Sequence, residues 1–142
     1  MADGASVGFL KSLDEAQADA YWRKVETAVS DGRCLLFADA GLTGTVQLDL
    51  DTMENQPHRA TVSKLLVDPS ARLQGLGVAL MGALEAHART DGRWLLTLDT
   101  ATDAADRLYW RLGWSAAGAI PDYAMNPDAS LTETRLYYKR LR

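Results

Sequence analysis

The sequence contains one cysteine, two histidines and no long hydrophobic run, and each scarcity excludes a class of protein. Cys34 cannot form a disulfide within the chain, and its apolar neighbours at 35–38 favour a small buried side chain over a reactive thiol. No apolar run approaches the roughly 20 residues that cross a bilayer, and the N-terminus lacks the pattern of a signal peptide. We therefore expect a cytoplasmic protein with no membrane partner.

Basic residues are not in excess, because 15 Lys and Arg stand against 19 Asp and Glu, for a formal charge of −4. Nucleic acids are bound through several Lys and Arg contacts that release counterions, so no nucleic-acid partner is expected. No Cys and His pair has metal-ligand spacing, and no Ser, His and Asp set is indicated, so no metal site is predicted. Without repeats, low-complexity segments or a linker, residues 1–142 are predicted to form a single domain.

Hydrophobic spacing predicts a mixed α/β domain. Apolar residues recur with helical spacing from Asp14 to Asp31 and again from Leu76 to Asp91, and Asp103 is expected to cap a shorter helix that ends at Gly113. Strands are predicted at 34–38, 43–50, 61–67, 94–98, 115–120 and 132–139.

The sequence allows more detailed predictions for two of these strands. In the strand at 43–50, Thr45, Gln47 and Asp49 alternate with apolar residues and are expected to face outward. The strand at 61–67 closes in a continuous apolar run, which favours a central strand buried on both faces.

Two glycines and an arginine lie where that central strand is followed by a helix, in the stretch Arg72-Leu-Gln-Gly75-Leu-Gly77. A strand, helix, strand unit places its two strands parallel through a right-handed crossover. Amide groups at the start of a helix suit phosphate oxygens, and glycine removes the Cβ atoms that would keep a diphosphate away. The spacing by itself fits either a tight turn or a phosphate-binding turn.

The pattern Arg72-x-x-Gly75-x-Gly77, followed by a strand and then Leu108-Tyr-Trp-Arg-Leu-Gly-Trp114, resembles the GCN5-related N-acetyltransferase (GNAT) family. The string His58-Arg-Ala-Thr-Val-Ser-Lys-Leu-Leu-Val67, with Leu98-Asp-Thr100 and Ile120-Pro-Asp-Tyr-Ala124 ahead of Pro127-Asp128, is similar to its tabtoxin-resistance-like branch. Members of that branch resemble small-molecule amine acetylators.

The resemblance implies a mixed central sheet flanked by helices. Relatives begin with a strand and a helix ahead of a segment like Gly4–Leu10, so the usual first strand and helix are expected to be missing here. An uncovered apolar sheet surface is rare in a monomer, which makes a homodimer a possible state.

The resemblance also implies acetyl-CoA as donor and a small-molecule amine as acceptor, which attacks directly within a ternary complex. Cofactor contacts are implied for the strand end, the glycine turn and the position of the family's usual asparagine: Leu65, Leu66, Val67, Arg72, Leu73, Gln74, Gly75, Leu76, Gly77, Val78 and Thr102.

Two residues are candidates for the chemistry. Tyr109 is expected to protonate the departing thiolate, since a phenol suits general-acid work, with aromatic packing as the alternative. Asp99 ends a strand, where ligands gather in open sheets, and is expected to accept the amine proton or orient the ammonium. It takes this role because Thr61 stands where the branch carries a glutamate, and a turn-capping role for Asp99 stays open.

The remaining polar candidates have weaker support. Tyr123 and Asp128 are predicted to line the acceptor pocket, although turn chemistry beside two prolines explains them about as well. His58 and His87 are interpreted as structural residues.

Two other functions stay open beside small-molecule acetylation. A toxin of the same fold would acetylate aminoacyl-tRNA, and the acidic charge balance counts against it. A non-catalytic acyl-CoA-binding module is consistent with Thr61 and the short N-terminus. A dinucleotide oxidoreductase is disfavoured because the third glycine of its fingerprint is absent after Gly77.

Overall fold

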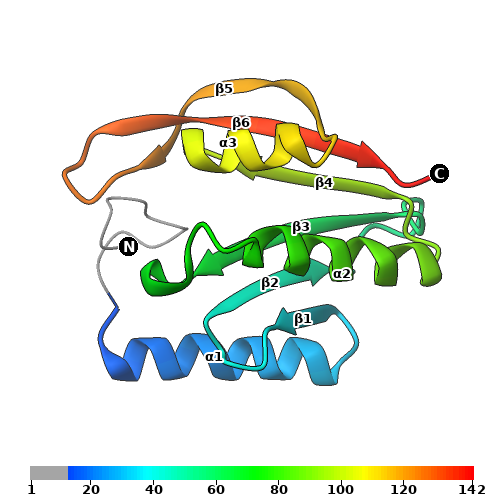
Figure 1. Ribbon diagram of the computed structural model, residues 1–142, viewed down its shortest axis with the longest axis horizontal. Coiled ribbons are helices and arrows are strands. Elements are labelled where there is room, and N and C mark those ends of the chain that lie inside the picture. Colours follow the sequence, from blue (N-terminus) through cyan, green and yellow to red (C-terminus); the bar gives the residue numbers. More distant parts are fainter. Residues whose placement is uncertain (1–12) are drawn as a thin grey trace.

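A computed structural model describes residues 13–142 and shows one mixed sheet flanked by helices, as the sequence predicts (Figure 1). The segment Gly4–Leu10, on which the expectation of a missing first strand and helix rests, lies outside the described residues. The elements in chain order are α1 (Glu15–Ser30), β1 (Cys34–Ala38), β2 (Gly44–Asp49), β3 (Arg59–Val67), the 3-10 turn η1 (Pro69–Ala71), α2 (Leu76–Thr90), β4 (Leu95–Thr100), α3 (Asp103–Arg111), β5 (Ser115–Met125) and β6 (Leu131–Arg140).

The six described strands are ordered β1-β2-β3-β4-β6-β5, so β3 and β4 form the centre of the sheet. These two strands are parallel and are joined through α2, whereas every other neighbouring pair is antiparallel. The predicted strand, helix, strand unit is therefore confirmed, and its loop of glycines lies beside the centre of the sheet.

One face of the sheet packs against α2 and α3 through a mainly apolar core. Leu48 of β2 and Leu96 of β4 are completely buried there, together with Met81 and Leu84 of α2. Burial of each of these side chains stabilises the fold by about 1.5–3 kcal/mol. The core therefore packs strands from both sides of the sheet centre against the same helices.

The opposite face is covered at one edge by α1. A capping box between Asp14 and Gln17 begins this helix, and the Nε2 atom of Gln47 donates a hydrogen bond to the Tyr21 hydroxyl at 2.7 Å. Gln47 is only 8% exposed, so the expectation that it faces solvent is wrong. The predicted alternation along β2 is present, but the polar face of the strand is the face that α1 covers. Cys34 is buried beside Gln47, and burial raises the pKa of its thiol.

Three other expectations need correction. Leu65, Leu66 and Val67 are half-buried instead of buried on both faces, because β3 leaves β4 before it reaches them. The cap of α3 is Thr102, whose Oγ1 accepts from the amide of Ala105 at 3.2 Å, and Asp103 is the first helical residue. The strand predicted to end at residue 120 continues to Met125, with an irregularity between Ile120 and Ala124 that accommodates Pro121.

Candidate active site

The central strands β3 and β4 separate after a short paired stretch. Their parallel pairing covers Arg59 with Leu95, Ala60 with Leu96 and Thr61 with Thr97, although β3 continues to Val67. From Val62 onward the edge of β3 that faces β4 lacks a paired strand in the described chain. Backbone N–H and C=O groups require hydrogen-bond partners, so this edge can receive an extended polar ligand between the strands.

A bulge in β3 marks the start of this separation. Ser63 pairs with Gln47 of β2 and Leu66 pairs with Thr45, so β3 has one residue more than β2 between these two pairs. Within this stretch Lys64 adopts a φ of 54°, which is unusual for a residue with a side chain. Bulges re-aim side chains and backbone groups, and here the change falls at the mouth of the gap between β3 and β4.

The glycine turn leads from the end of β3 to α2. Leu73 and Gly75 both have positive φ, at 60° and 78°, and Gly75 is the N-cap of α2 without a side-chain hydrogen bond. The first amides of α2 therefore have no side-chain acceptor, as a helix start that binds an anion requires. Arg72 lies at the same turn, and its Nε donates to the carbonyl of Val67 at 3.3 Å.

Tyr109 and Asp99 are brought close together from α3 and β4. Tyr109 is 6% exposed, and burial, with the nearby carboxylates of Asp99 and Asp106, raises its pKa to about 12. Asp99 is exposed, and its Oδ2 accepts a hydrogen bond from the Thr134 hydroxyl of β6 at 3.0 Å. Burial lowers the pKa of Lys64, and the charge of Asp99 opposes that change, which places the ammonium in the same cluster.

Three other predicted site residues have local structural partners. The Thr102 hydroxyl serves as the cap of α3. Tyr123 lies on β5 and is 55% exposed. Asp128 lies in the turn before β6, where its Oδ1 accepts from both the hydroxyl and the amide of Ser130, and these hydrogen bonds lower its pKa.

Sequence reasoning did not single out Lys64 or Arg59, and both lie at the separation of the central strands. A lysine directly before the apolar run at Leu65 to Val67 was a usable indication for Lys64. Arg59 gave no such indication, because its neighbours on β4 are 38 positions away in the chain.

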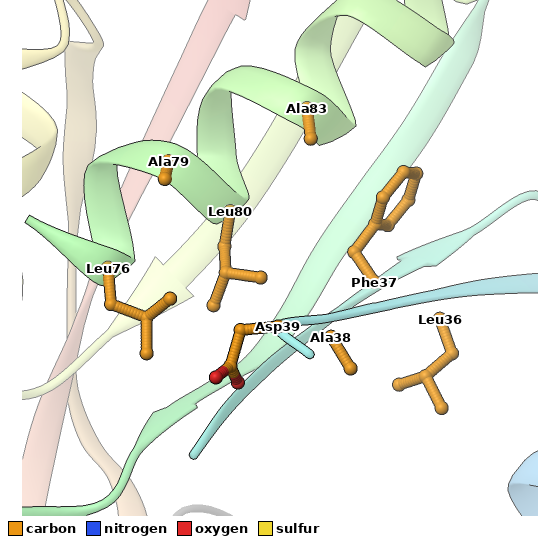
Figure 2. A pocket seen from close by; sticks show the side chains of 8 residues that line it. All are labelled: Leu36, Phe37, Ala38, Asp39, Leu76, Ala79, Leu80 and Ala83. Carbon is orange, nitrogen blue, oxygen red and sulfur yellow. The ribbon is translucent and has the colours of Figure 1, made fainter. Parts of the chain in front are cut away.

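The hollow lined by apolar residues lies elsewhere. Figure 2 shows it between β1 and α2, with Phe37 directed toward the helix. It holds about 390 Å³ and includes Leu76 as its only predicted site residue. Among residues 13–142 no helix is suited to crossing a membrane, and no cluster of His, Cys, Asp or Glu could hold a metal ion.

Solved structures share this arrangement of strands and helices. The structure of yncA from Salmonella typhimurium, with its cofactor acetyl-CoA, matches with a TM-score of 0.75 at 19% identity, over 93% of this chain and 76% of that one. The ribosomal-protein-S18-alanine N-acetyltransferase from Escherichia coli matches with a TM-score of 0.69 at 20% identity, over 92% of both chains. The ribosomal-protein-alanine N-acetyltransferase from Brucella melitensis matches with a TM-score of 0.75 at 20% identity, over 98% and 90% of the two chains.

A mixed sheet with separated central strands and a glycine turn beside them thus defines an acetyltransferase fold. The model of the acetyltransferase (GNAT) family matches residues 6–114, and the chain belongs to this family. The enzyme class predicted from the sequence, an acetyl-CoA-dependent N-acetyltransferase, is confirmed, and so is acetyl-CoA as its donor. The assignment to the tabtoxin-resistance-like branch stays a prediction.

Proposed function

We propose that this protein transfers the acetyl group of acetyl-CoA to an amine of a small molecule, by direct attack within a ternary complex. The observation that carries the proposal is the separation of β3 from β4 after Thr61 and Thr97, with Tyr109 and Asp99 close to each other near its mouth. The gap between β3 and β4 opens toward both faces of the sheet, so the donor and the acceptor can approach each other from opposite sides.

The donor would be held by backbone groups. The free edge of β3 at Leu65, Leu66 and Val67 offers amide and carbonyl groups to the pantetheine arm. The first amides of α2, behind the positive φ of Gly75, offer a site for the diphosphate. The acetyl thioester supplied by the bound donor would then lie near the bulge at Lys64.

Tyr109 supplies the proton for the leaving group. The amine nitrogen attacks the thioester carbon, the carbon–sulfur bond breaks, and the Tyr109 hydroxyl donates its hydrogen to the departing sulfur. Because burial raises the pKa of this phenol to about 12, it keeps its proton throughout the physiological range. A thiol has a pKa near 8.5, so the equilibrium of this proton transfer is uphill by roughly 3–4 pKa units, and reprotonation of Tyr109 by solvent draws the step to completion.

Asp99 receives the proton that the amine loses. Its Oδ2 is occupied by the Thr134 hydroxyl, while Oδ1 has no hydrogen-bond partner within residues 13–142. This carboxylate can orient an ammonium group and accept its proton, directly or through water. Solvent then takes that proton and restores the one given up by Tyr109, so each cycle forms one amide and one thiol.

The test is Tyr109→Phe, assayed by thiol release over a library of amines. The ring is kept, so the Kd for acetyl-CoA should not change, while loss of the donor should lower kcat by about 10²–10⁴-fold. If the thiolate leaves unprotonated into water, the loss should be only about tenfold. Tyr21→Phe is the matched control, because it removes a hydroxyl bonded to Gln47 on the α1 side.

Wild-type kcat in Tyr109→Phe from about pH 6 to 9 would make Tyr109 a packing residue. Two further measurements separate the alternatives. Binding of bulk tRNA to filters would favour acetylation of aminoacyl-tRNA. Binding of CoA without turnover of any amine would favour a non-catalytic module.

A further inference from the structure

The side chain of Arg59 contacts Thr61 and Thr97, the last residue pair that joins the two central strands. Its neighbours Ala60 and Val62 are buried on the α2 side, and alternation along a strand places Arg59 and Thr61 on the opposite face. The Nη1 atom of Arg59 donates to the hydroxyl of Thr61 at 3.0 Å and to the hydroxyl of Thr97 at 3.1 Å. The guanidinium therefore lies where β3 and β4 begin to separate.

The position of Arg59 is held by its surroundings. Its Nε donates to the Oε1 atom of Gln56 at 2.9 Å, and its backbone carbonyl accepts from the Nη1 atom of Arg93 at 2.7 Å. Arg93 also donates to the carbonyl of Leu50, which anchors the start of β3 to the preceding loop. A half-buried side chain with this many contacts is preorganised for binding.

The charge of Arg59 is not matched by an acid. Three other partly buried cations form ion pairs with carboxylates: Arg93 with Asp91, Arg135 with Asp106 and Lys139 with Glu85. All recorded hydrogen-bond partners of the Arg59 side chain are neutral groups. Within residues 13–142 it forms no salt bridge.

Part of the guanidinium is open to a ligand. Three of its five N–H groups are used by Gln56, Thr61 and Thr97, and the two on Nη2 have no recorded partner in the described chain. They are not sealed inside the protein either, because the only buried unpaired side-chain nitrogen or oxygen found among residues 13–142 is Nε of Arg135. A carboxylate oxygen accepts strong, charge-assisted hydrogen bonds from N–H donors of this kind.

We propose that the acceptor amine also carries a carboxylate and that Arg59 binds it, as a specificity-determining residue. The inference rests on the proposed acetyl transfer at the gap between β3 and β4. Ser63 and Lys64 lie two to three residues beyond Thr61, or about 7–10 Å along the strand. The thioester is expected beside Lys64, so this length approximates the distance from the guanidinium to the attacking amine. The hydrogen bond to the carboxylate takes about 3 Å of it, so about 4–7 Å remain between the carboxylate and the amine. This span fits short amino acids whose two groups are a few bonds apart.

The first test measures binding and needs no turnover. With enzyme saturated by CoA, calorimetry compares N-acetyl-β-alanine with N-acetyl-β-alaninamide, and N-acetylglycine and N-acetyl-γ-aminobutyrate with their amides. The best carboxylate should bind about tenfold or more tightly than its amide. Equal binding of every acid and its amide to the wild-type protein would overturn the proposal, with no variant needed.

Variants then assign the preference to Arg59. Arg59→Gln should remove the advantage of the acid while the Kd for acetyl-CoA stays unchanged, and Arg59→Lys should keep part of it. Arg89→Gln is the matched control, because Arg89 is an exposed arginine of α2 on the opposite face and should leave the preference intact. If the preference for acids over amides survives in Arg59→Gln, the proposal is wrong and Arg59 serves only to connect β3 with β4.

Turnover separates this inference from the proposed function. For β-alanine and its homologues, Arg59→Gln should raise KM about tenfold or more while kcat stays within about threefold, because the carboxylate is remote from the reacting atoms. Thiol release with no preference for acids would overturn the role of Arg59 and leave acetyl transfer standing. Selective binding of the acids without thiol release would support the role of Arg59 and overturn acetyl transfer to amines.

Discussion

A valine at Gly75 tests whether the turn before α2 holds the diphosphate of acetyl-CoA. Gly75 has a φ of 78°, and a Cβ added there would meet no atom within 4 Å. The substitution therefore causes no internal clash, and its cost to folding comes from the backbone. A residue with a side chain loses about 1–2 kcal/mol in this left-handed region, and a β-branched one more.

Gly92 provides a matched control at the other end of the same helix. Its φ is 75°, and a Cβ there also meets nothing within 4 Å. Gly75→Val and Gly92→Val should therefore lower the free energy of unfolding by similar amounts. Only the first places a branched side chain in front of the amides that begin α2.

Acetyl-CoA affinity should fall by an order of magnitude or more in Gly75→Val, equivalent to about 1.4 kcal/mol or more, and should not change in Gly92→Val. Calorimetry measures both Kd values, and thermal unfolding measures the strain. Gly75→Asn separates strain from exclusion, because asparagine accepts positive φ but still adds a side chain, so it should fold well and bind weakly. Unchanged affinity in a folded Gly75→Val protein, or equal losses in the two valine variants, would refute the phosphate-binding turn.

Two more predictions follow from buried groups and from the sheet edge. Folding raises the pKa of Tyr109 to about 12, so its contribution to stability is complete below the unfolded value near 10 and is lost as the pH rises from there to about 12. Alkaline unfolding curves should show a shallower fall for Tyr109→Phe than for the wild type, and parallel curves would contradict this. The apolar hollow beside β1, in which Leu36 is 39% exposed, should be covered by a second copy of the chain. Light scattering should report a dimer that Leu36→Lys weakens, whereas a monomer at high concentration would count against it.

Local features of this protein were determined by the sequence alone. Helical spacing from Asp14 predicted α1, and two glycines between an apolar strand and a helix predicted the turn before α2, where Gly75 has a positive φ. These structures depend on neighbours a few positions apart, so spacing and residue type were enough to predict them. The strand, helix, strand unit and the family resemblance followed from the same local patterns.

The sequence was less informative wherever distant strands meet. Alternation identified the two faces of β2, but only packing placed Gln47 beneath α1 and not in water. The apolar run at Leu65 to Val67 was read as fully buried, because composition does not show that β3 leaves β4 before that run begins.

The candidate site itself was decided by the tertiary structure. Thr61 and Thr97 are 36 positions apart, yet their hydroxyls lie 3.4 Å from each other under the guanidinium of Arg59. Tyr109 of α3 and Asp99 of β4 approach each other only because α3 packs back over the sheet. Strand pairing fixes such contacts through backbone hydrogen bonds between segments whose order in the sheet no local pattern specifies. The sequence alone therefore identified the family and located the glycine turn between β3 and α2, while the separation of β3 and β4 and the position of Arg59 beside it came from the fold.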